Sequence, residues 1–181
     1  MRCEVRGWVL GKFALVLILT TALSLSEART IDPVTKPHLH AHCIALVEAS
    51  IADIKKQMSE LVSEAQNDSK STAGDKHETG RAMMQLAQEQ LGKQMLEAEV
   101  KRNQLVRLDT KSKHARITEG SLVDTSTGTL FLAAPIGKIQ FENKDIFVLS
   151  AQSPLGKILI GRSEGESVSF NQRSIHILSI S

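Results

Sequence analysis

The sequence predicts an α+β protein in which a long antiparallel helical hairpin, a coiled coil, precedes a small β-rich domain. Three observations support this fold class. Apolar residues recur at steps of three and four in the first half of the chain, and one polar turn interrupts them. Short β-branched segments separated by turns follow from about residue 120. The 181 residues suffice for one ordinary domain or two small ones.

Residues 1–33 differ in composition from the rest of the chain. Basic residues precede an apolar run at 13–19, and small residues follow at 24–28, which is the outline of a secretory signal peptide. The run is shorter than the roughly 20 residues that span a membrane, so no stable membrane association is expected. The basic residues are Arg2, Arg6 and Lys12.

A second interpretation of residues 1–33 stays open. Bacterial genes can start at a GTG codon, which is read as Val inside a gene, and Val34 stands where the helical pattern begins. Residues 1–33 would then be a spuriously translated leader, and the protein would be cytoplasmic. A genuine signal peptide over residues 1–28 would instead make it an exported protein.

The helical hairpin is expected over residues 34–110. One helix is predicted from about His38 to Asn67, and a second from about Glu78 to Leu108. Ser, Asn, Asp and Gly gather between them, as in turns. Each helix of about 30 residues would be about 45 Å long. The first seam is predicted at Ile44, Val47, Ile51, Ile54, Met58, Leu61 and Ala65, and the second at Met84, Ala87, Leu91, Met95, Ala98, Leu105 and Leu108.

The C-terminal domain is expected over residues 111–181. Ser153 and Pro154 have the pattern of an N-cap followed by proline at the first helical position, so a short helix is predicted at 155–160 and ends before Gly161. Strands are predicted at 121–124, 129–133, 138–141, 146–150, 167–170 and 174–180, with a turn at 142–145.

Several function classes find little support in the composition. The aromatic share is 3% and there is no Tyr, which argues against an RNA-stacking surface. The net charge of +2 does not mark a nucleic-acid binder. No nucleophile with a base partner, phosphate loop or Cys/His metal set is visible, so an independent enzyme is not expected. Cys3 and Cys43 are interpreted as unpaired thiols. His38, His40 and His42 are interpreted as solvated or packing residues rather than as a zinc site.

Two motifs resemble the Gre family of transcription elongation factors, GreA and GreB. Gly74-Asp75-Lys76-His77-Glu78 is similar to the Gly-Asp-x-x-Glu pattern at the family's coiled-coil tip. Residues 153–161, Ser-Pro-Leu-Gly-Lys-Ile-Leu-Ile-Gly, followed by Glu-Gly-Glu at 164–166, are similar to a stretch of the family's C-terminal domain. Gly120-Ser-Leu-Val123 looks like that domain's opening strand. The resemblance covers about residues 37–180.

The resemblance implies a fold and a mechanism. The C-terminal domain would be FKBP-like and would bind the rim of the RNA polymerase secondary channel through Ser153, Pro154, Leu155, Gly156 and Lys157. The hairpin would enter the channel, and Asp75 and Glu78 would help to hold a Mg²⁺ ion shared with the polymerase active site. The polymerase would then cleave backtracked RNA. Nucleic acid would be met only through the elongation complex, and the chain would hold no metal or cofactor of its own.

The tip departs from the family pattern after Glu78. Gre factors usually continue Asn-Ala-Glu-Tyr, whereas this chain has Thr-Gly-Arg-Ala at 79–82, so Arg81 replaces an acid. Arg81 could pair with Asp75 or Glu78, or contact RNA phosphate. Three functions stay open: a cleavage-stimulating factor, a channel-binding regulator without cleavage, and an exported coiled-coil interaction protein. Helix capping is the simpler role for the two acids.

Overall fold

The structure is a computed structural model that describes residues 35–68, 76–112 and 114–181. The side chains of residues 35, 65–68 and 76–79 are not described. The chain divides into two units, Met1–Thr30 and Ile31–Ser181, and every described residue belongs to the second. The predictions for residues 1–33 therefore lie outside the described residues. Within the described part of the chain, no helix is long and apolar enough to cross a membrane.

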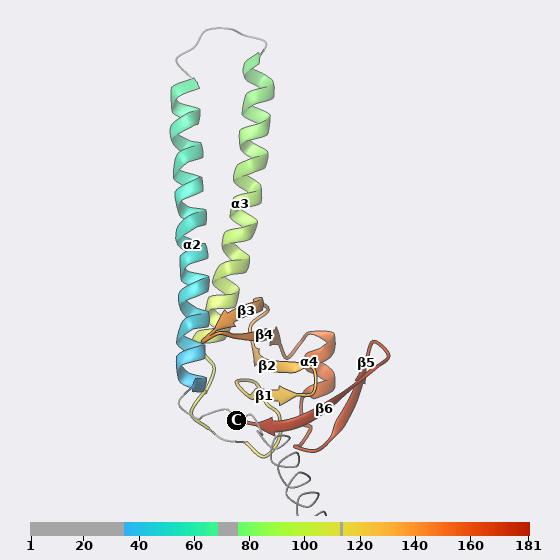
Figure 1. Cartoon of the computed structure of the whole chain (residues 1–181). Helices are drawn as coiled ribbons and strands as arrows, with labels where there is room; N and C mark the ends of the chain where they lie inside the picture. Colours follow the sequence, from blue (N-terminus) through green and yellow to red (C-terminus); the bar gives the residue numbers. More distant parts are fainter. Residues whose placement is uncertain (1–34, 69–75, 113) are drawn as a thin grey trace, which may run out of the picture. The chain divides into compact units, whose positions relative to one another are not determined.

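Two long helices run side by side as an antiparallel hairpin (Figure 1). Helix α2 spans Thr35–Asp68, and helix α3 spans Lys76–Val106. Both predicted helices are confirmed, and their ends differ from the prediction by one to three residues. Helix α2 starts before Pro37 because proline is tolerated in the first turn of a helix.

The two helices pack through a narrow apolar seam. Ile54, Leu91 and Ala98 are buried in it, and Met58 and Met95 pack against them. Gln94 is exposed, so Met95 takes the seam position that a strict heptad would give to Gln94. Closer to the sheet, Arg102 Nε lies 3.1 Å from Glu48 Oε1 and joins the helices by an exposed ion pair.

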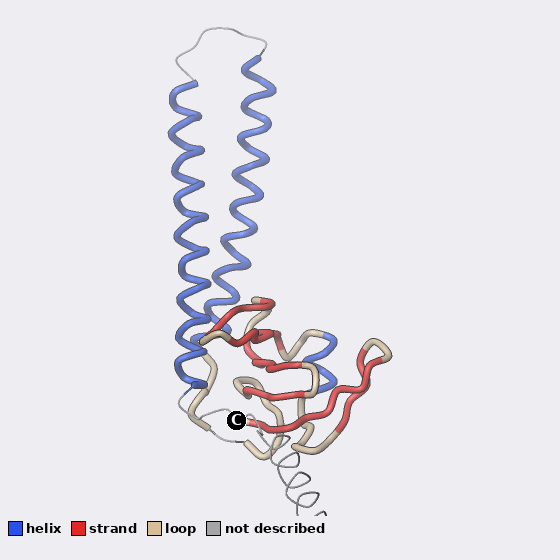
Figure 2. Tube along the Cα trace, in the orientation of Figure 1, coloured by secondary structure: helices blue, strands red, loops and turns tan. Residues whose placement is uncertain are grey.

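The C-terminal half forms a six-stranded mixed sheet with the order β3-β4-β2-β1-β6-β5. Its strands are drawn in red in Figure 2. Strands β2 and β4 are parallel, and every other neighbouring pair is antiparallel. The strands are β1 (Leu122–Thr125), β2 (Gly128–Ala133), β3 (Gly137–Phe141), β4 (Lys144–Ser150), β5 (Ser167–Phe170) and β6 (Arg173–Ile180), and the short helix α4 is Pro154–Leu159. A hairpin followed by a β-rich domain is thus confirmed, whereas the FKBP-like character stays a prediction.

Each face of the sheet is covered by different elements. Alternate residues of a strand point to opposite faces, so Leu122 and Phe131 join one apolar cluster, while Val123 and Leu132 join the other. The first cluster includes Leu39, Cys43, Val47 and Leu105 from the ends of α2 and α3 nearest the sheet. The second includes Leu159 of α4. The sheet is therefore the platform that holds both the hairpin and α4.

Two tight turns fix the register of the antiparallel strands. Glu142 and Asn143 have φ values of 49° and 60°, and Asn171 and Gln172 have 49° and 63°. Two consecutive residues with positive φ are typical of a two-residue type I′ hairpin, whose twist matches that of the strands. The turn predicted at 142–145 is shorter than expected, because Lys144 and Asp145 already belong to β4.

Candidate functional site

The predicted tip residues are only partly within the described residues. Asp75 lies outside them, and Glu78 belongs to α3 although its side chain is not described. Arg81 is exposed on α3, three residues after Glu78 and thus nearly one helical turn further along. The roles of Asp75, Glu78 and Arg81 stay predictions.

The second group of predicted site residues, 153–157, forms the N-cap and the first turn of α4. Ser153 is the N-cap: its Oγ accepts a hydrogen bond from the backbone N–H of Gly156 at 3.0 Å. Pro154 occupies the first turn, where its missing N–H leaves no intrahelical bond unmade. The backbone N–H of Lys157 donates to the Ser153 carbonyl at 2.9 Å. The predicted cap is therefore confirmed.

Gly156 allows α4 to approach the end of β4 closely. A Cβ atom at this position would lie 2.2 Å from the Ser150 carbonyl oxygen and 2.9 Å from Ala151 Cα. Both neighbours are backbone atoms, so they cannot rotate away as a flexible side chain can. Gly156 is buried and holds the helix in place, and it presents no side chain to a partner.

The surface that α4 offers to a partner is small. Pro154 and Lys157 are exposed, and Ile160, directly after the helix, is 39% exposed. Leu155 and Ile158 are half-buried and pack against the apolar cluster under α4. An exposed cation beside apolar side chains suits the edge of a protein interface, where a polar rim surrounds an apolar core.

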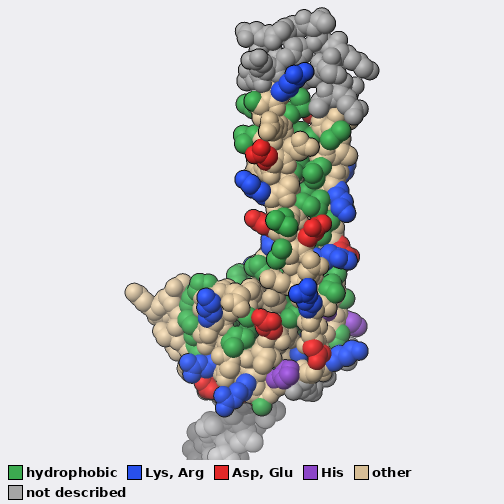
Figure 3. Space-filling view, turned by 180° about the vertical axis from the view of Figure 1, so that it is seen from behind, with side chains coloured by type: hydrophobic (Ala, Val, Ile, Leu, Met, Phe, Trp, Pro, Cys, Tyr) green, Lys and Arg blue, Asp and Glu red, His purple; other side chains and the backbone are tan. Residues whose placement is uncertain are grey.

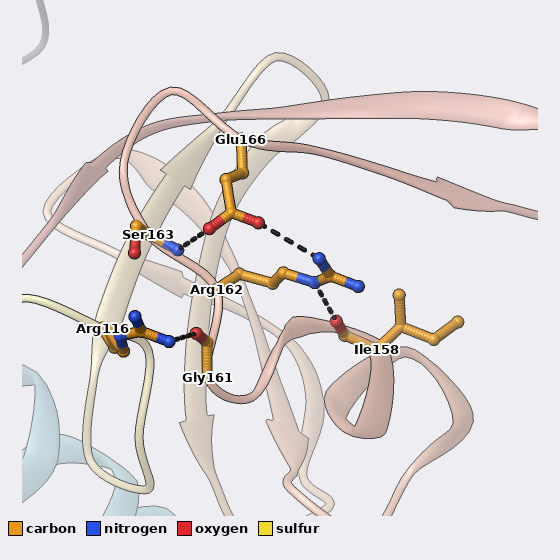
Figure 4. Close-up of polar contacts among 6 residues, drawn as sticks. All are labelled: Arg116, Ile158, Gly161, Arg162, Ser163 and Glu166. Atoms are coloured by element: carbon orange, nitrogen blue, oxygen red, sulfur yellow. Dashed lines mark hydrogen bonds and ion pairs between the residues drawn. The ribbon is translucent and has the colours of Figure 1, made fainter.

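The loop after α4 is organised by one glutamate (Figure 4). Glu166 Oε1 accepts the backbone N–H of Ser163 at 3.0 Å, and Glu166 Oε2 lies 3.1 Å from Arg162 Nη1. The Ser163 N–H, followed by the Arg162 guanidinium, lowers the pKa of Glu166 below its usual value. Arg162 Nε also donates to the Ile158 carbonyl at 3.4 Å, so this arginine joins α4 to the loop.

The same loop is joined to the segment before the sheet. The backbone N–H of Ile117 donates to the Arg162 carbonyl at 2.8 Å, and the Gly161 N–H donates to the Ile117 carbonyl at 2.8 Å. Gly161 has φ +80°, which L side chains rarely adopt. Arg116 Nη1 reaches the Gly161 carbonyl at 3.4 Å. These bonds hold Arg116 and Arg162 at the end of α4.

Sequence reasoning did not single out these two arginines. Arg162 and Glu166 have the four-residue spacing of an ion pair, but they lie in a loop and not in a helix. Arg116 meets Gly161 across 45 residues of sequence. The i,i+4 spacing is the one signal that could have pointed to the first pair.

His40, His42 and the buried cysteine are packing residues, whereas His38 is exposed. His40 Nε2 donates to the Leu105 carbonyl at 2.8 Å, and the His42 ring centroid lies 5.3 Å from that of Phe141. Burial raises the pKa of the Cys43 thiol to about 11. Within the described residues, no group of three or more His, Cys, Asp or Glu side chains could hold a metal ion.

Two hollows along the hairpin have polar walls. One of about 400 Å³ is lined by Gln57, Glu60, Leu61, Glu64, Ala87, Gln90, Leu91 and Gln94. The other, of about 580 Å³, is lined by Glu48, Ile51, Ala52, Lys55, Glu99, Arg102 and Asn103. Small-molecule sites are usually lined mainly by apolar and aromatic groups. The hollows are therefore grooves between helices rather than evident ligand sites.

No protein-family model matches the chain, and no curated protein matches it. Among solved structures, the chain is similar to one described as the structure of the transcription factor Gfh1. The two share 16% identity with a TM-score of 0.31, and the match covers 76% of this chain and 92% of that chain. Likeness at this level establishes neither a shared fold nor a shared function.

Proposed function

We propose that this chain is a Gre-type transcription factor that binds RNA polymerase and promotes cleavage of backtracked RNA. The observation that carries the proposal is the placement of its two motifs. In sequence, one motif stands between the two long helices and runs into the start of α3, and the other forms the cap, helix and loop of α4 on the β domain. The proposal implies a cytoplasmic protein whose contact with nucleic acid is made within the elongation complex.

The dimensions of the hairpin suit insertion into a channel. Helix α2 has 34 residues and α3 has 31, which correspond to lengths of about 51 and 46 Å. The sheet-packed ends hold Leu39 and Leu105, whereas Ile54 and Leu91 pack only within the seam cluster of the two helices. The visible face of the hairpin carries charged side chains interspersed with apolar ones (Figure 3), and a rod with a thin buried seam and charged flanks is suited to a water-filled channel.

The chemistry of the tip would come from its carboxylates. Mg²⁺ prefers oxygen ligands and commonly takes one or two protein carboxylates while it keeps several waters. Asp75 and Glu78 are three residues apart, a spacing that would place both side chains on one side of the helix if it began at Asp75. Their role would be to hold the second metal ion, which activates water, at the active site of the polymerase.

Arg81 favours a second candidate function. Its exposed side chain follows Glu78 by three residues and adds a positive charge at the end of α3 nearest the tip. A cation so close to the two acids would compete with Mg²⁺ for them. The chain would then occupy the channel and regulate the polymerase without stimulating cleavage.

A cleavage assay on stalled, backtracked elongation complexes tests the proposal. The natural chain is compared with Asp75→Ala and Glu78→Ala, and polymerase binding is measured in the same samples. We expect cleavage to fall at least about tenfold in each variant while binding persists, as for loss of a catalytic electrostatic contact. Binding without cleavage by the natural chain would support the regulator instead, and absence of binding would reject both functions.

The α4 surface provides a matched test of docking. Lys157→Glu reverses the exposed charge on α4, while Lys144→Glu reverses an exposed lysine on β4. We expect Lys157→Glu to weaken polymerase binding and Lys144→Glu to leave it nearly unchanged. Equal binding by the two variants would remove α4 from the proposed interface.

A further inference from the structure

Helix α3 carries a second apolar stripe on its outer side. Leu86 is 65% exposed, Leu96 63% and Val100 49%, although these are large apolar side chains. They lie away from the seam, where Leu91 and Ala98 are buried against α2. Isolated exposed apolar residues are ordinary on protein surfaces, so the question is whether these three form one pattern.

The spacing of the stripe is that of a coiled-coil face. Counting from Ala82, successive members lie four, three, four, three and four residues apart, which keeps them on one line of a supercoiled helix. The seam residues Leu91, Ala98 and Leu105 repeat every seven residues, and the stripe occupies positions on the opposite side of the same heptads. The stripe consists of Ala82, Leu86, Glu89, Lys93, Leu96 and Val100.

The stripe of one chain would match the same stripe of a second chain that runs in the opposite direction. About the level of Leu91, Leu86 and Leu96 are equally distant, and so are Glu89 and Lys93. An antiparallel second copy aligned at that level would therefore place leucine against leucine and each charge against its opposite. Ala82 would face Val100 in the same alignment, so that a small residue meets a larger one.

Other alignments lose this match. A parallel copy would place Glu89 against Glu89 and Lys93 against Lys93, and like charges repel. An antiparallel copy shifted by one heptad would place both charges against apolar residues, where they would lose water without gaining a partner. The charge pattern thus selects one geometry, a two-fold symmetric contact in which both chains use the same patch.

We propose that the outer stripe of α3 is an interface with a second copy of this chain, arranged as an antiparallel dimer symmetric about Leu91. The stripe covers 18 helical steps and is about 27 Å long, so the contact is short and its population depends on protein concentration. The proposal does not rest on the function proposed above. If the hairpin also enters a polymerase channel, the dimer has to dissociate first.

Sedimentation of the full chain over a range of concentrations tests the interface. We expect a reversible monomer–dimer equilibrium, and we expect Val100→Glu to raise the dissociation constant by about tenfold or more, because a valine that the dimer would bury becomes a carboxylate. Val62→Glu is the matched control, since Val62 is 46% exposed on α2 and lies outside the stripe. Association that survives Val100→Glu, or a natural chain that stays monomeric, would overturn the proposal.

Charge reversal provides a second test that does not depend on the folding of one variant. Glu89→Lys alone and Lys93→Glu alone should each weaken the dimer, because both symmetric pairs become repulsive. An equimolar mixture of the two variants should form a heterodimer, since one chain then presents two lysines to two glutamates. A mixture no more associated than its components would contradict the predicted pairing.

Disulfide cross-linking tests the orientation. In a Cys3→Ser background, Leu86→Cys chains and Leu96→Cys chains should be cross-linked to each other on oxidation. Each variant alone should not, because the two copies of one position would lie about 15 Å apart along the helices, beyond disulfide reach. Cys43 is fully buried and does not compete. Cross-linking within Leu86→Cys alone would indicate a parallel dimer and reject the proposed geometry.

Discussion

His40 Nε2 donates a hydrogen bond to the backbone oxygen of Leu105 across 2.8 Å, and so joins the first turns of α2 to the last turn of α3. The last carbonyls of a helix have no partner within the helix. Leu105 O receives a second bond from the Leu108 N–H at 3.1 Å. The neighbouring Leu39 is fully buried against the sheet, so this bond lies where the hairpin meets the β domain.

Removal of this hydrogen bond should destabilise the protein modestly. We expect His40→Ala to lower the free energy of unfolding by about 1 kcal/mol, the usual net value of one hydrogen bond. His38→Ala is the control, because His38 is exposed on the same helix. Urea denaturation of both variants measures the difference, and equal midpoints would show that the bond contributes no net stability.

Two glycine-to-alanine substitutions should have opposite effects. At Gly156 the new Cβ would collide with the Ser150 carbonyl, so we expect a loss of about 1–3 kcal/mol, the range for overpacking. At Gly92, in α3, no atom lies within 4 Å of the added Cβ. Gly92→Ala should therefore stabilise the helix by about 0.5–1 kcal/mol. Thermal unfolding decides the two signs, and a neutral Gly156→Ala would show that α4 can move away from β4.

Glu166 should make stability depend on pH. Its folded pKa is lowered, chiefly by the Ser163 N–H, so its stabilisation is complete above the pKa of the unfolded state and is lost as the pH falls through the folded pKa. We expect the Tm difference between the natural chain and Glu166→Gln to be largest near pH 7 and to shrink below about pH 4. Glu119→Gln, at an exposed glutamate, should change Tm little at either pH. A constant difference for Glu166→Gln would contradict the assigned contacts.

Cys43 should be inert while the protein is folded. Burial raises the pKa of its thiol to about 11, and the thiolate is the form that reacts with alkylating reagents. We expect iodoacetamide at pH 8 to modify Cys43 only after denaturation, with mass spectrometry of peptides used to identify the site. Rapid modification under native conditions would mean that the end of α2 separates readily from the sheet.

Arg81 should limit the proposed cleavage activity. Under the function proposed above, Arg81→Glu removes a cation that competes for Asp75 and Glu78, and it places an acid where Gre factors usually have one. We expect faster cleavage by the polymerase at unchanged binding. Lys55→Glu, at an exposed position on α2 outside the stripe, serves as the control for charge alone. Slower cleavage with Arg81→Glu would assign Arg81 a productive contact with RNA or polymerase.

The sequence predicted the elements more completely than their contacts. The hairpin followed from heptad spacing, and α4 from Ser153 and Pro154, because these signals are local. The strand order, with β4 between β3 and β2, depends on pairing between distant segments, which no local pattern encodes. The bonds from Arg116 and His40 cross 45 and 65 residues and were missed for the same reason.

Only part of the candidate site could likewise be predicted from sequence. The cap at Ser153 could be assigned from sequence because a helix cap has residue preferences. Gly156 was predicted only as a docking residue, and its close approach to Ser150 was not predicted. The position of α4 on the sheet decides which of its side chains are exposed, and sequence alone does not show it. Pro154 and Lys157 are exposed, whereas Leu155 is half-buried. Asp75 and Glu78 stay predictions from sequence, with neither side chain among the described ones.

The pairing of β1 with the last residues described sets an order for folding during synthesis. Leu122 and Ser181 exchange two backbone hydrogen bonds, at 2.9 and 2.8 Å, and β6 lies between β1 and β5. The sheet therefore closes only after Ser181 has left the ribosome, long after α2 and α3 have emerged. Leu39 and Cys43 are covered by residues of β1 to β4, the last of them Val148, so they stay uncovered only until β4 has emerged. Until that point a nascent hairpin with exposed apolar ends is a natural substrate for chaperones.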